Sequence, residues 1–526
     1  MMLYSNPILE AIRARADDAQ TSHKIAIHEA YGRKISYADL QQSVEALAQN
    51  LVANGFQQND RVLMLVRPNI ATLQIVLAVV RAGGVLVIAD PAMGQAVFQD
   101  RVALAQPRWV FVEDAVLLLQ KTSFIRRLLR GRGIEIPEIG RLTIPHIISV
   151  GRLPFLGTHR LTQMMQATKQ PVVEQTRPLK DDITIVFTSG TTGKPKGVVH
   201  TLKSMLATIE RVRDYAQLTS DDVVYDTGIL FIIPALMAGA TVVMGHGRFD
   251  AAKTVQTYRD YGVTKTLDVP RHMKAMLTYL QHGGEILPDT LQDVLLGAAP
   301  VFADFLQALQ SVAHPNTRIW SIYGMTELLP AALVSLEDKL DFDRAGGDLV
   351  GAPMAGLSVR IADDGELLVQ GDGLYDRYLG QAAITEHHTG DMARLDEQGR
   401  IVLLGRKKDM IIRGKHNIYP PLFEPLIRQI EGVRDCAMVG VYNPSKADED
   451  IVLFIEAETP ITEKQLRQLL LSGEYSIDLY AQPDHILFAT LPYSGRSLKL
   501  DKKALRQQAR QQLGIADTGT ASHFER

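Results

Sequence analysis

The sequence predicts an α/β protein, because segments with the pattern of buried strands alternate with segments of helical periodicity. Residues 62–66 and 85–89 are short, continuous apolar runs, which is typical of strands covered on both faces of a parallel sheet. A helix is expected from Ser36 onward, where apolar side chains recur at helical spacing. Alternation of these two patterns favours an α/β fold with parallel strands.

The chain is long enough for more than one domain, since its 526 residues exceed the size at which a single hydrophobic core stops growing. The alternation of strands and helices resumes beyond residue 180, and residues 355–404 have the pattern of short strands separated by turns. A polar run at 405–409 follows the last of these strands. We therefore predict a large domain of residues 1–405 and a small α/β domain of residues 406–526.

Composition and charge are those of an ordinary globular protein. Hydrophobic residues make up 46% and charged residues 22% of the chain, so extensive disorder is not expected. The formal net charge is −3, which gives no global attraction to nucleic acid. Cys436 is the only cysteine, so neither an intrachain disulfide nor a cysteine-based metal cluster is expected. Its apolar neighbours predict that the thiol is buried in a core.

The expected location is the cytoplasm. Residues 1–18 lack the basic and then apolar pattern of a signal peptide. The most apolar stretch, residues 75–89, is interrupted by Arg81 and two glycines and is too short to cross a bilayer.

Residues 115–175 differ in charge from their surroundings and are interpreted as an insertion. Basic side chains gather there, and these are Lys121, Arg126, Arg127, Arg130, Arg132 and Arg141. Apolar side chains share one helical face with part of this set. Such a helix either packs on its own domain with its charges in solvent, or lies on an anionic membrane surface. Peripheral membrane contact through residues 121–141 is therefore one of two open alternatives.

A loop rich in glycine and hydroxyl groups follows the apolar run 183–187. Its residues are Thr188, Ser189, Gly190, Thr191, Thr192, Gly193, Lys194, Pro195, Lys196 and Gly197. Glycines let a backbone approach a bulky anion, while hydroxyl and N–H groups donate to phosphate oxygens. The loop is not the common P-loop, which needs four residues between its glycines and Ser or Thr after the lysine.

This loop closely resembles the phosphate-binding signature of the acyl-adenylate-forming superfamily, which includes acyl-CoA synthetases, peptide-synthetase adenylation domains and luciferases. The resemblance extends over nearly the whole chain. It implies a large N-terminal domain of α/β subdomains plus a β-barrel-like part, with a small mobile α/β C-terminal domain. It also implies ATP and Mg²⁺ as reactants. The loop residues implied at the nucleotide are Thr188, Ser189, Gly190, Thr191, Thr192 and Lys196.

Two further motifs resemble nucleotide-binding loops of the same superfamily. Gly297, Ala298 and Ala299 follow an apolar run and resemble the loop that packs on adenine. Tyr323 and Gly324 begin an aromatic–glycine–x–Thr–Glu motif, in which the aromatic ring is expected to stack on adenine.

The same motif ends in Thr326 and Glu327. The resemblance implies that Thr326 contacts the α-phosphate. It implies that Glu327 helps to hold Mg²⁺, a hard cation that favours carboxylate and phosphate oxygens. Glu327 and Thr188 are accordingly expected to take part in catalysis.

The predicted domain junction carries another group of matches. Asp391, in a Thr-Gly-Asp motif, is expected to accept hydrogen bonds from the ribose hydroxyls, and Arg406 to contact ribose or phosphate. Lys408 falls at the family's hinge position. Gly414 lies in a loop that resembles the thiol tunnel of CoA ligases, although Lys415 replaces the second glycine of that loop.

Lys499 is the expected catalytic lysine. It aligns with the family's late lysine if one residue is inserted, and Leu498 replaces the usual preceding glycine. The resemblance places its ammonium between the substrate carboxylate and the α-phosphate, where it stabilises the charge of the transition state. Lys502 and Lys503, which follow, are expected to be solvated residues of a helix.

These motifs predict an AMP-forming acid–thiol ligase. The enzyme would activate a carboxylic acid to acyl-AMP with ATP and then transfer the acyl group to CoA. Residues 228–235 are apolar, which suggests a hydrophobic acid, with a fatty acyl group favoured, although a role of these residues in core packing is equally consistent.

Other second steps and another class of protein stay open. Residues 90–94, the basic insertion and residues 323–330 resemble the β-lactone synthetases of bacterial olefin biosynthesis, which cyclise a β-hydroxy acyl-AMP without CoA. Transfer to the thiol of a carrier protein is a third possibility. A non-catalytic nucleotide-binding or membrane-associated scaffold is disfavoured by the intact phosphate loop and by Glu327.

Overall fold

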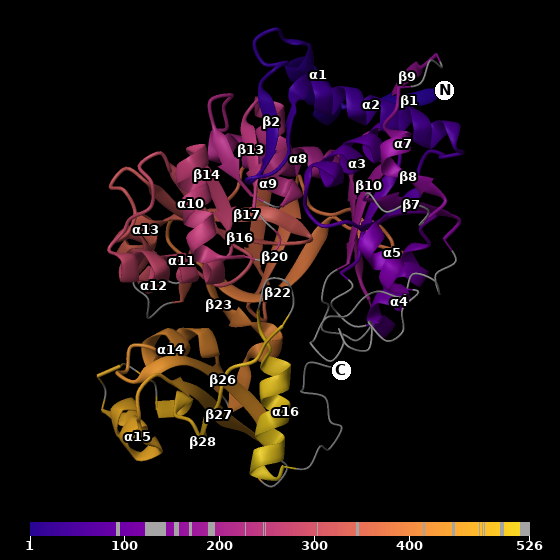
Figure 1. Ribbon diagram of the computed structural model, residues 1–526. Helices are drawn as coiled ribbons and strands as arrows, with labels where there is room; N and C mark the ends of the chain where they lie inside the picture. The colour runs from indigo at the N-terminus through magenta and orange to yellow at the C-terminus, as the bar shows by residue number, and fades with distance from the viewer. Residues whose placement is uncertain are drawn as a thin grey trace.

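The computed structural model has a mixed α/β architecture with a large upper part and a small lower part (Figure 1). It describes residues 1–515, except for 91–94, 121–143, 152–156, 168–170, 188–194, 343–346, 414–415, 444–445, 495–498 and the single residues 227, 246, 248, 302, 447, 473, 476 and 478. In the described part of the chain, no helix is long and apolar enough to span a bilayer.

The first large sheet has eight strands in the order β21-β11-β10-β5-β4-β6-β7-β8. From β10 to β8 neighbouring strands are parallel, whereas β11 is antiparallel to both β10 and β21. The strands are β4 (Arg61–Leu65), β5 (Val85–Ile88), β6 (Trp109–Glu113), β7 (His146–Val150), β8 (His159–Arg160), β10 (Asp182–Phe187), β11 (Gly197–Thr201) and β21 (Arg377–Tyr378).

The second large sheet has thirteen strands in the order β19-β20-β22-β23-β18-β17-β16-β15-β14-β12-β13-β2-β3. Its parallel centre is β2 (Ile25–Glu29), β12 (Val223–Tyr225), β13 (Thr241–Met244), β14 (Lys265–Asp268), β15 (Asp293–Leu296) and β16 (Arg318–Met325). The antiparallel remainder is β3 (Lys34–Ser36), β17 (Leu328–Ser335), β18 (Asp348–Pro353), β19 (Leu357–Ile361), β20 (Glu366–Gly371), β22 (Glu386–Leu395) and β23 (Ile401–Arg406).

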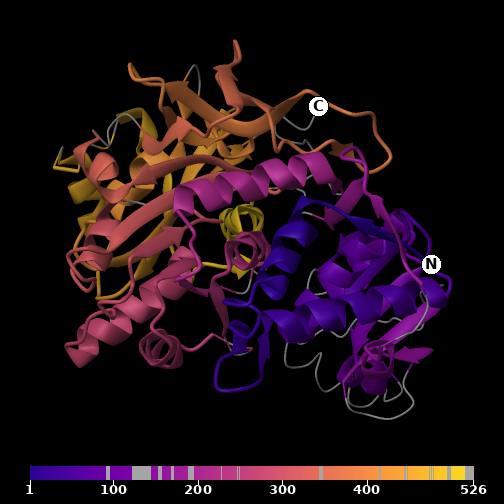
Figure 2. The ribbon, with the colours of Figure 1, turned by 90° about the horizontal axis from the view of Figure 1, so that it is seen from above.

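Helices cover both sheets and fill the space between them (Figures 1 and 2). The central layer consists of α2 (Tyr37–Ala53), α3 (Ile70–Arg81), α8 (Leu202–Ala216) and α9 (Ile229–Ala238). The outer face of the first sheet packs against α4 (Gln95–Ala105) and α5 (Asp114–Gln120). The outer face of the second sheet packs against α10 (Ala251–Tyr261), α11 (Pro270–Gly283), α12 (Ala303–Gln310) and α13 (Leu336–Asp341).

The remaining elements of the upper part lie at its edges. They are α1 (Pro7–Asp17), α7 (Leu161–Met164), and the parallel pair β1 (Met2–Ser5) and β9 (Val173–Thr176). Strands β7 and β8 lie within residues 115–175 and extend the first large sheet, and β9 begins within them, so the described parts of this predicted insertion belong to the sheets of the fold. The basic stretch 121–141 lies wholly outside the described residues, and membrane contact through it stays a prediction.

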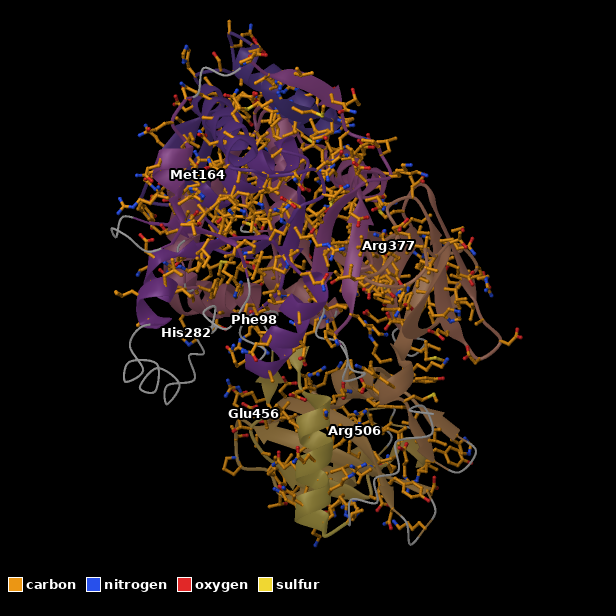
Figure 3. The ribbon with its side chains drawn as sticks, turned by 90° about the vertical axis from the view of Figure 1, so that its right-hand side faces the viewer. Phe98, Met164, His282, Arg377, Glu456 and Arg506 are labelled. Carbon is orange, nitrogen blue, oxygen red and sulfur yellow. The ribbon has the colours of Figure 1, made fainter. Side chains whose placement is uncertain are left out.

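The lower part contains three small sheets (Figure 1). They consist of β24 (Ile411–Arg413) with β25 (His416–Ile418), β26 (Val433–Asn443) with β27 (Asp448–Ala457) and β28 (His485–Phe488), and β29 (Tyr493–Ser494) with β30 (Lys499–Leu500). The helices are α14 (Pro420–Ile427), α15 (Glu463–Leu471), α16 (Lys502–Leu513), and the 3₁₀ turns η4 (Lys407–Asp409) and η5 (Leu479–Ala481). Figure 3 shows Glu456 and Arg506 in this part, below Phe98, Met164 and Arg377.

The predicted α/β class is confirmed, and so are several predicted elements. The expected helix after Ser36 is α2, whose first turn is capped because the Ser36 side chain accepts from the Asp39 N–H. The predicted strands at 62–66 and 85–89 are the parallel neighbours β4 and β5. Cys436 is buried as expected. The division into domains at residue 405 stays a prediction, although the lower part has hydrophobic clusters of its own.

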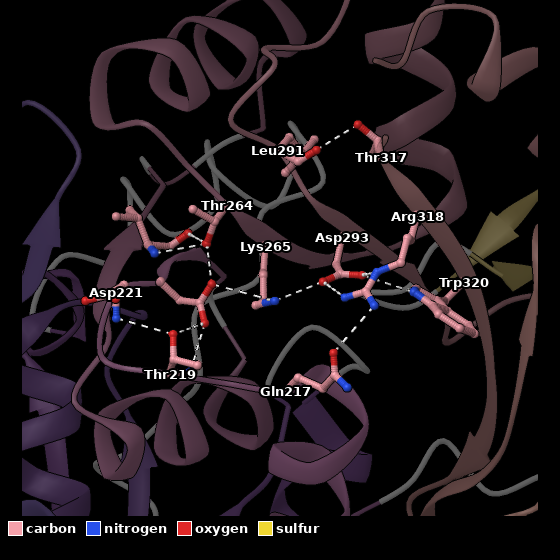
Figure 4. A network of polar contacts seen from close by, with 12 residues as sticks. Gln217, Thr219, Asp221, Thr264, Lys265, Leu291, Asp293, Thr317, Arg318 and Trp320 are labelled. Carbon is pink, nitrogen blue, oxygen red and sulfur yellow. Dashed lines mark hydrogen bonds and ion pairs between the residues drawn. The ribbon is translucent and has the colours of Figure 1, made fainter. Parts of the chain in front are cut away.

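A buried ionic network locks the amino ends of the central strands of the second sheet (Figure 4). Lys265 Nζ lies 2.9 Å from Asp293 Oδ2 and 3.6 Å from a carboxylate oxygen of Asp222. Arg318 donates to both oxygens of Asp293 at 2.8 Å, and Trp320 Nε1 donates to Asp293 Oδ1 at 3.1 Å. Asp293 therefore joins β14, β15 and β16 at the sheet edge opposite to their carboxyl ends.

We expect Asp293→Asn to destabilise the large part of the molecule by about 3 kcal/mol, because Lys265 loses a buried counter-charge. Burial raises the pKa of Asp293, but its bonds with Arg318 and Lys265 outweigh burial and hold the pKa below its usual value. The stabilisation is thus present above the unfolded pKa and lost as pH falls through the folded pKa. Urea unfolding followed by the fluorescence of Trp109 and Trp320 measures both effects.

The control is Glu386→Gln, which removes the charge of an exposed pair with Arg360 and should change the unfolding midpoint little. Equal midpoints for the two variants would contradict a structural role for the network.

Candidate active site

Two of the predicted site motifs lie at the carboxyl ends of neighbouring central strands, where ligands of open α/β sheets bind. Gly297 follows β15 and Tyr323 lies near the end of β16, next to it in the sheet. Ala298 has φ of 66°, a left-handed conformation that costs a non-glycine residue about 1–2 kcal/mol. Such conformations cluster at functional sites. Ala299 is half-buried beside it.

Tyr323, Asp391 and Arg406 are brought together by β16, β22 and β23. The Tyr323 hydroxyl donates to Asp391 Oδ2 at 2.6 Å, and Arg406 Nε lies 2.6 Å from Asp391 Oδ1. Tyr323 and Asp391 are buried, and burial raises the pKa of each. The charge of Arg406 and the bond from Tyr323 act in the opposite direction on Asp391. A buried carboxylate with two directed partners is a fixed acceptor for further donors.

The turn that carries Asp391 is fixed by its neighbours. The Asp391 N–H donates to Thr389 Oγ1 at 3.0 Å, and Thr389 Oγ1 donates to the Leu367 carbonyl at 2.8 Å. Glu366 accepts from the Gly390 N–H at 2.9 Å. Gly390 has φ of 70°, which suits glycine and few other residues.

Glu327 is held by Tyr378, a contact that sequence reasoning missed. The Tyr378 hydroxyl donates to Glu327 Oε1 at 2.9 Å, and Lys196 Nζ lies 5.1 Å from the centre of the Tyr378 ring. The Tyr375 N–H donates to the Glu327 carbonyl at 2.8 Å. Tyr378 thus links the predicted metal ligand to the described end of the phosphate loop.

His200 is a second residue that the sequence reasoning did not single out. It is buried in β11, three residues beyond the loop, and its Nε2 lies 2.8 Å from the Thr326 carbonyl. Burial lowers the pKa of His200, although the Thr326 carbonyl and the charge of Glu327 oppose this effect. The Nε2–H of the imidazole donates to the Thr326 carbonyl. Strand β11 therefore helps to fix the position of the turn that contains Thr326. A histidine three residues after the loop was the signal in the sequence that could have indicated this role.

Lys499 belongs to the lower part but faces the same cluster. Part of its side chain is exposed, yet the protein atoms crowded around it lower its pKa, with repulsion from Arg406 adding to this effect and attraction to Asp391 opposing it. The charges of Arg406 and Asp391 therefore act on the ammonium of Lys499, which β30 carries.

Lys408 lies in η4, between the upper and lower parts. Burial lowers its pKa; Asp409 opposes the shift, whereas Arg406, Arg506 and Lys499 add to it. Arg506 of α16 donates to Asp409 Oδ1 at 2.7 Å, which ties the last helix to this turn.

The expectation that Lys502 is solvated is wrong. Its Nζ lies 3.0 Å from Glu424 Oε1, and Glu424 is buried. Glu424 also accepts from the Met438 N–H at 2.8 Å, so the lysine neutralises a carboxylate inside the small part. Lys503 is exposed as expected.

Several predicted site residues lie outside the described residues: Thr188, Ser189, Gly190, Thr191, Thr192 and Gly414. Their assignments stay predictions. Gly324 lies in β16, and Thr326 is exposed.

The apolar segment 228–235 belongs mostly to the core. Residues from Phe231 to the end of α9 are buried between the two sheets, while Gly228 is exposed and Ile229 and Leu230 are half-buried. Only the first residues of this helix can therefore face a substrate.

The donor set suits Mg²⁺ that arrives with a nucleotide. No group of three or more His, Cys, Asp or Glu side chains with the arrangement of a metal site occurs among the described residues. Mg²⁺ usually binds through one or two carboxylates together with substrate phosphates. Glu327, fixed by Tyr378 beside Lys196, fits that requirement.

Comparison with known proteins agrees with this geometry. The sequence profile of the family described as AMP-binding enzyme matches residues 14–379. The 2-succinylbenzoate–CoA ligase of Listeria monocytogenes is 25% identical over 491 residues, which cover 91% of this chain and 95% of the relative. The olefin β-lactone synthetase of Xanthomonas campestris is 27% identical over 477 residues, which cover 82% of each chain.

Solved structures share the fold. ATP-bound MatB from Rhodopseudomonas palustris superposes with a TM-score of 0.76 and 25% identity, over 96% of this chain and 99% of the other. The amide bond synthetase McbA from Marinactinospora thermotolerans gives a TM-score of 0.79 at 20% identity, over 96% of this chain and 100% of the other. The latter likeness shows the fold alone.

We expect Tyr378→Phe to weaken the Mg²⁺-dependent binding of ATP roughly tenfold, because Glu327 loses the hydroxyl that orients it. Calorimetric titration of ATP at graded Mg²⁺ concentrations measures this effect. The matched control is Tyr31→Phe, which keeps the ring and removes an exposed hydroxyl that donates to Asp260 Oδ2 at 2.5 Å. An identical Mg²⁺ dependence in the Tyr378→Phe protein and the wild type would contradict this role.

Proposed function

The chain belongs to the AMP-binding enzyme family, and from this premise we propose that it activates a carboxylic acid with ATP and transfers the acyl group to CoA. The observation that carries the proposal is the cluster of Tyr323, Asp391 and Arg406, together with the action of the Asp391 and Arg406 charges on Lys499. The proposed hydrogen-bond acceptor for a nucleoside and the proposed cation for an anionic reaction centre thus belong to the same cluster.

In the first step, a substrate carboxylate oxygen attacks the α-phosphorus of ATP. A new P–O bond forms the mixed anhydride acyl-AMP, and the bond to pyrophosphate breaks. Asp391 would accept from the ribose hydroxyls, and Arg406 would contact ribose or phosphate. The ammonium of Lys499 offsets the repulsion between the carboxylate and the phosphate and stabilises the charge of the transition state. Glu327 and the phosphate oxygens would hold Mg²⁺, which supplies further positive charge at the triphosphate.

In the second step, the sulfur of CoA attacks the acyl carbonyl carbon. A C–S bond forms, the bond to the phosphate oxygen of AMP breaks, and the thiol proton passes to solvent. Lys499 has no task at this stage, and we propose that the small domain turns about Lys408 so that the thiol enters past Gly414.

The acid is proposed to be hydrophobic. The half-buried residues at the start of α9, Ile229 and Leu230, support this class, and no charged residue lies in segment 228–235. The named relatives differ, since one is called a ligase of 2-succinylbenzoate and another a β-lactone synthetase. A fatty acyl and an aryl acid are therefore both to be assayed.

A second candidate for the later step is β-lactone formation. It is favoured by the match to the olefin β-lactone synthetase over 82% of each chain and by Lys415, which replaces a glycine in the thiol loop. In this case the β-hydroxyl oxygen of the acyl-AMP attacks its own carbonyl carbon. The four-membered ring closes, AMP leaves, and the hydroxyl proton passes to solvent.

One set of assays tests the proposal and separates its alternatives. Acid-dependent exchange between ATP and labelled pyrophosphate is measured with fatty acids, 3-hydroxy fatty acids and aryl acids of graded length. Mass spectrometry with and without CoA then identifies the products. We expect acyl-CoA and AMP only when CoA is present. A β-lactone and AMP from a 3-hydroxy acid without CoA would replace the proposed second step. Absence of exchange with every acid would reject the first step.

We expect Lys499→Ala to slow acid-dependent pyrophosphate exchange about 100- to 1000-fold, the usual loss when one transition-state charge partner is removed. AMP release from supplied acyl-AMP should change little, because Lys499 acts only in the first step. Lys503→Ala, at an exposed lysine of α16, is the matched control. A comparable loss in both half-reactions would indicate a structural defect and contradict the assigned role.

The exchange rate should fall on the alkaline side at a lower pH than for an ordinary lysine. The charged form of Lys499 is the active one, and its pKa lies below the ordinary value of 10.5, so the charge is lost as pH rises through the lowered pKa. A Lys499→Arg variant keeps its charge and should extend the plateau. If the exchange rates of the wild type and the Lys499→Arg variant fall over the same alkaline pH range, a group other than Lys499 titrates.

A further inference from the structure

Among the described residues, Tyr493 of the hairpin that carries Lys499 contacts the large part of the molecule. In this hairpin β29 pairs with β30, and Ser494 lies opposite Lys499. The guanidinium carbon of Arg271, in the first turn of α11, lies 5.7 Å from the centre of the Tyr493 ring. A cation at this distance is attracted to the face of the ring. The contact joins α11 of the large part directly to Tyr493 of the hairpin.

Tyr493 is fixed on the side of the small part. Its hydroxyl donates to Asp435 Oδ2 at 2.8 Å, and Arg428 Nε donates to Asp435 Oδ1 at 2.6 Å. Burial raises the pKa of Asp435, but Arg428 and the tyrosine hydroxyl outweigh it and hold the pKa below its usual value. The ring is therefore tied to β26 and to the end of α14 through a charged carboxylate of the small part.

The charge of Arg271 is not stabilised by its own helix. It occupies the second position of α11, where the helix dipole disfavours a cation. Among the described residues it forms no ion pair. The helix is anchored, because Met273 and Met276 are buried in the core on the outer face of the second sheet. Arg271 therefore presents its charge from a fixed base, directly after the carboxyl end of β14.

We propose that Arg271 and Tyr493 form a latch that favours the orientation in which Lys499 faces Asp391 and Arg406. Both are positioning residues, because they act through the hairpin on Lys499. This inference rests on the proposed function, in which the small domain turns between the two steps. The latch contact is made in the orientation for acyl-AMP formation and must break for the second step. An exposed cation–π contact favours the first orientation about two- to fivefold.

The test separates the two half-reactions. Arg271→Ala and Tyr493→Leu should each lower acid-dependent pyrophosphate exchange about two- to fivefold. AMP release from supplied acyl-AMP should stay the same or rise, because the small domain can then leave the first orientation without breaking the latch contact. Arg271→Lys should restore part of the exchange rate. The double variant should lose no more than either single variant, since both break one contact. Arg213→Ala, at an exposed arginine of α8, is the control for a lost surface charge.

Tyr493→Phe distinguishes the ring contact from its anchor, because it keeps the ring and removes the bond to Asp435. We expect a smaller loss of exchange than with Tyr493→Leu. Orientation is read independently from fluorescence transfer between labels on cysteines introduced at exposed Lys203 and Glu463, since the buried thiol of Cys436 does not compete for label. Arg271→Ala should shift the ATP-bound distribution away from the wild-type distance.

Additive losses in the double variant, equal losses in both half-reactions, or an unchanged label distance would overturn the latch. Failure of the proposed function looks different, because the wild-type protein would then show no acid-dependent exchange at all. An active wild type with an unaffected Arg271→Ala variant rejects the latch alone.

Discussion

The buried carboxylate of Asp391 is the point on which the two parts of the molecule converge. An ionised group away from water is stable only with opposite charge and directed hydrogen bonds around it. Asp391 receives these from Tyr323 of β16 and Arg406 of β23, and it attracts Lys499 of β30. A strand from the centre of the large sheet, the last strand before the junction and the hairpin of the small part are thereby aligned by one residue.

The two ends of the central strands have different structural roles. At their amino ends, Asp293 and Lys265 bind the strands with short ionic contacts that leave little freedom. At their carboxyl ends, loops and turns carry Ala298, Tyr323 and Thr326, and His200 donates to the backbone carbonyl of Thr326. A stiff base allows the loops above it to keep defined positions.

Local patterns in the sequence were enough to predict the elements but not the contacts between distant segments. Periodicity located β4, β5 and α2, and a serine marked the start of α2, because these signals depend on neighbours in the chain. The bond between Tyr378 and Glu327 joins residues 51 positions apart, and the pair of Lys502 and Glu424 joins residues 78 positions apart. No periodic signal records such pairing, so Tyr378 was missed and Lys502 was wrongly expected in solvent. The cluster of Asp391, Arg406 and Lys499 followed from motifs whose spacing is shared across a family.

The single thiol of the chain is sealed inside the small part. Cys436 donates from Sγ to the Glu424 carbonyl at 3.3 Å, and burial raises its pKa, so it stays protonated and out of reach. Mixed anhydrides acylate accessible thiolates readily, because the thiolate is the reactive form of cysteine. A protein that generates such an electrophile and keeps its only thiol neutral behind β-strands does not consume its own product by acylating its cysteine.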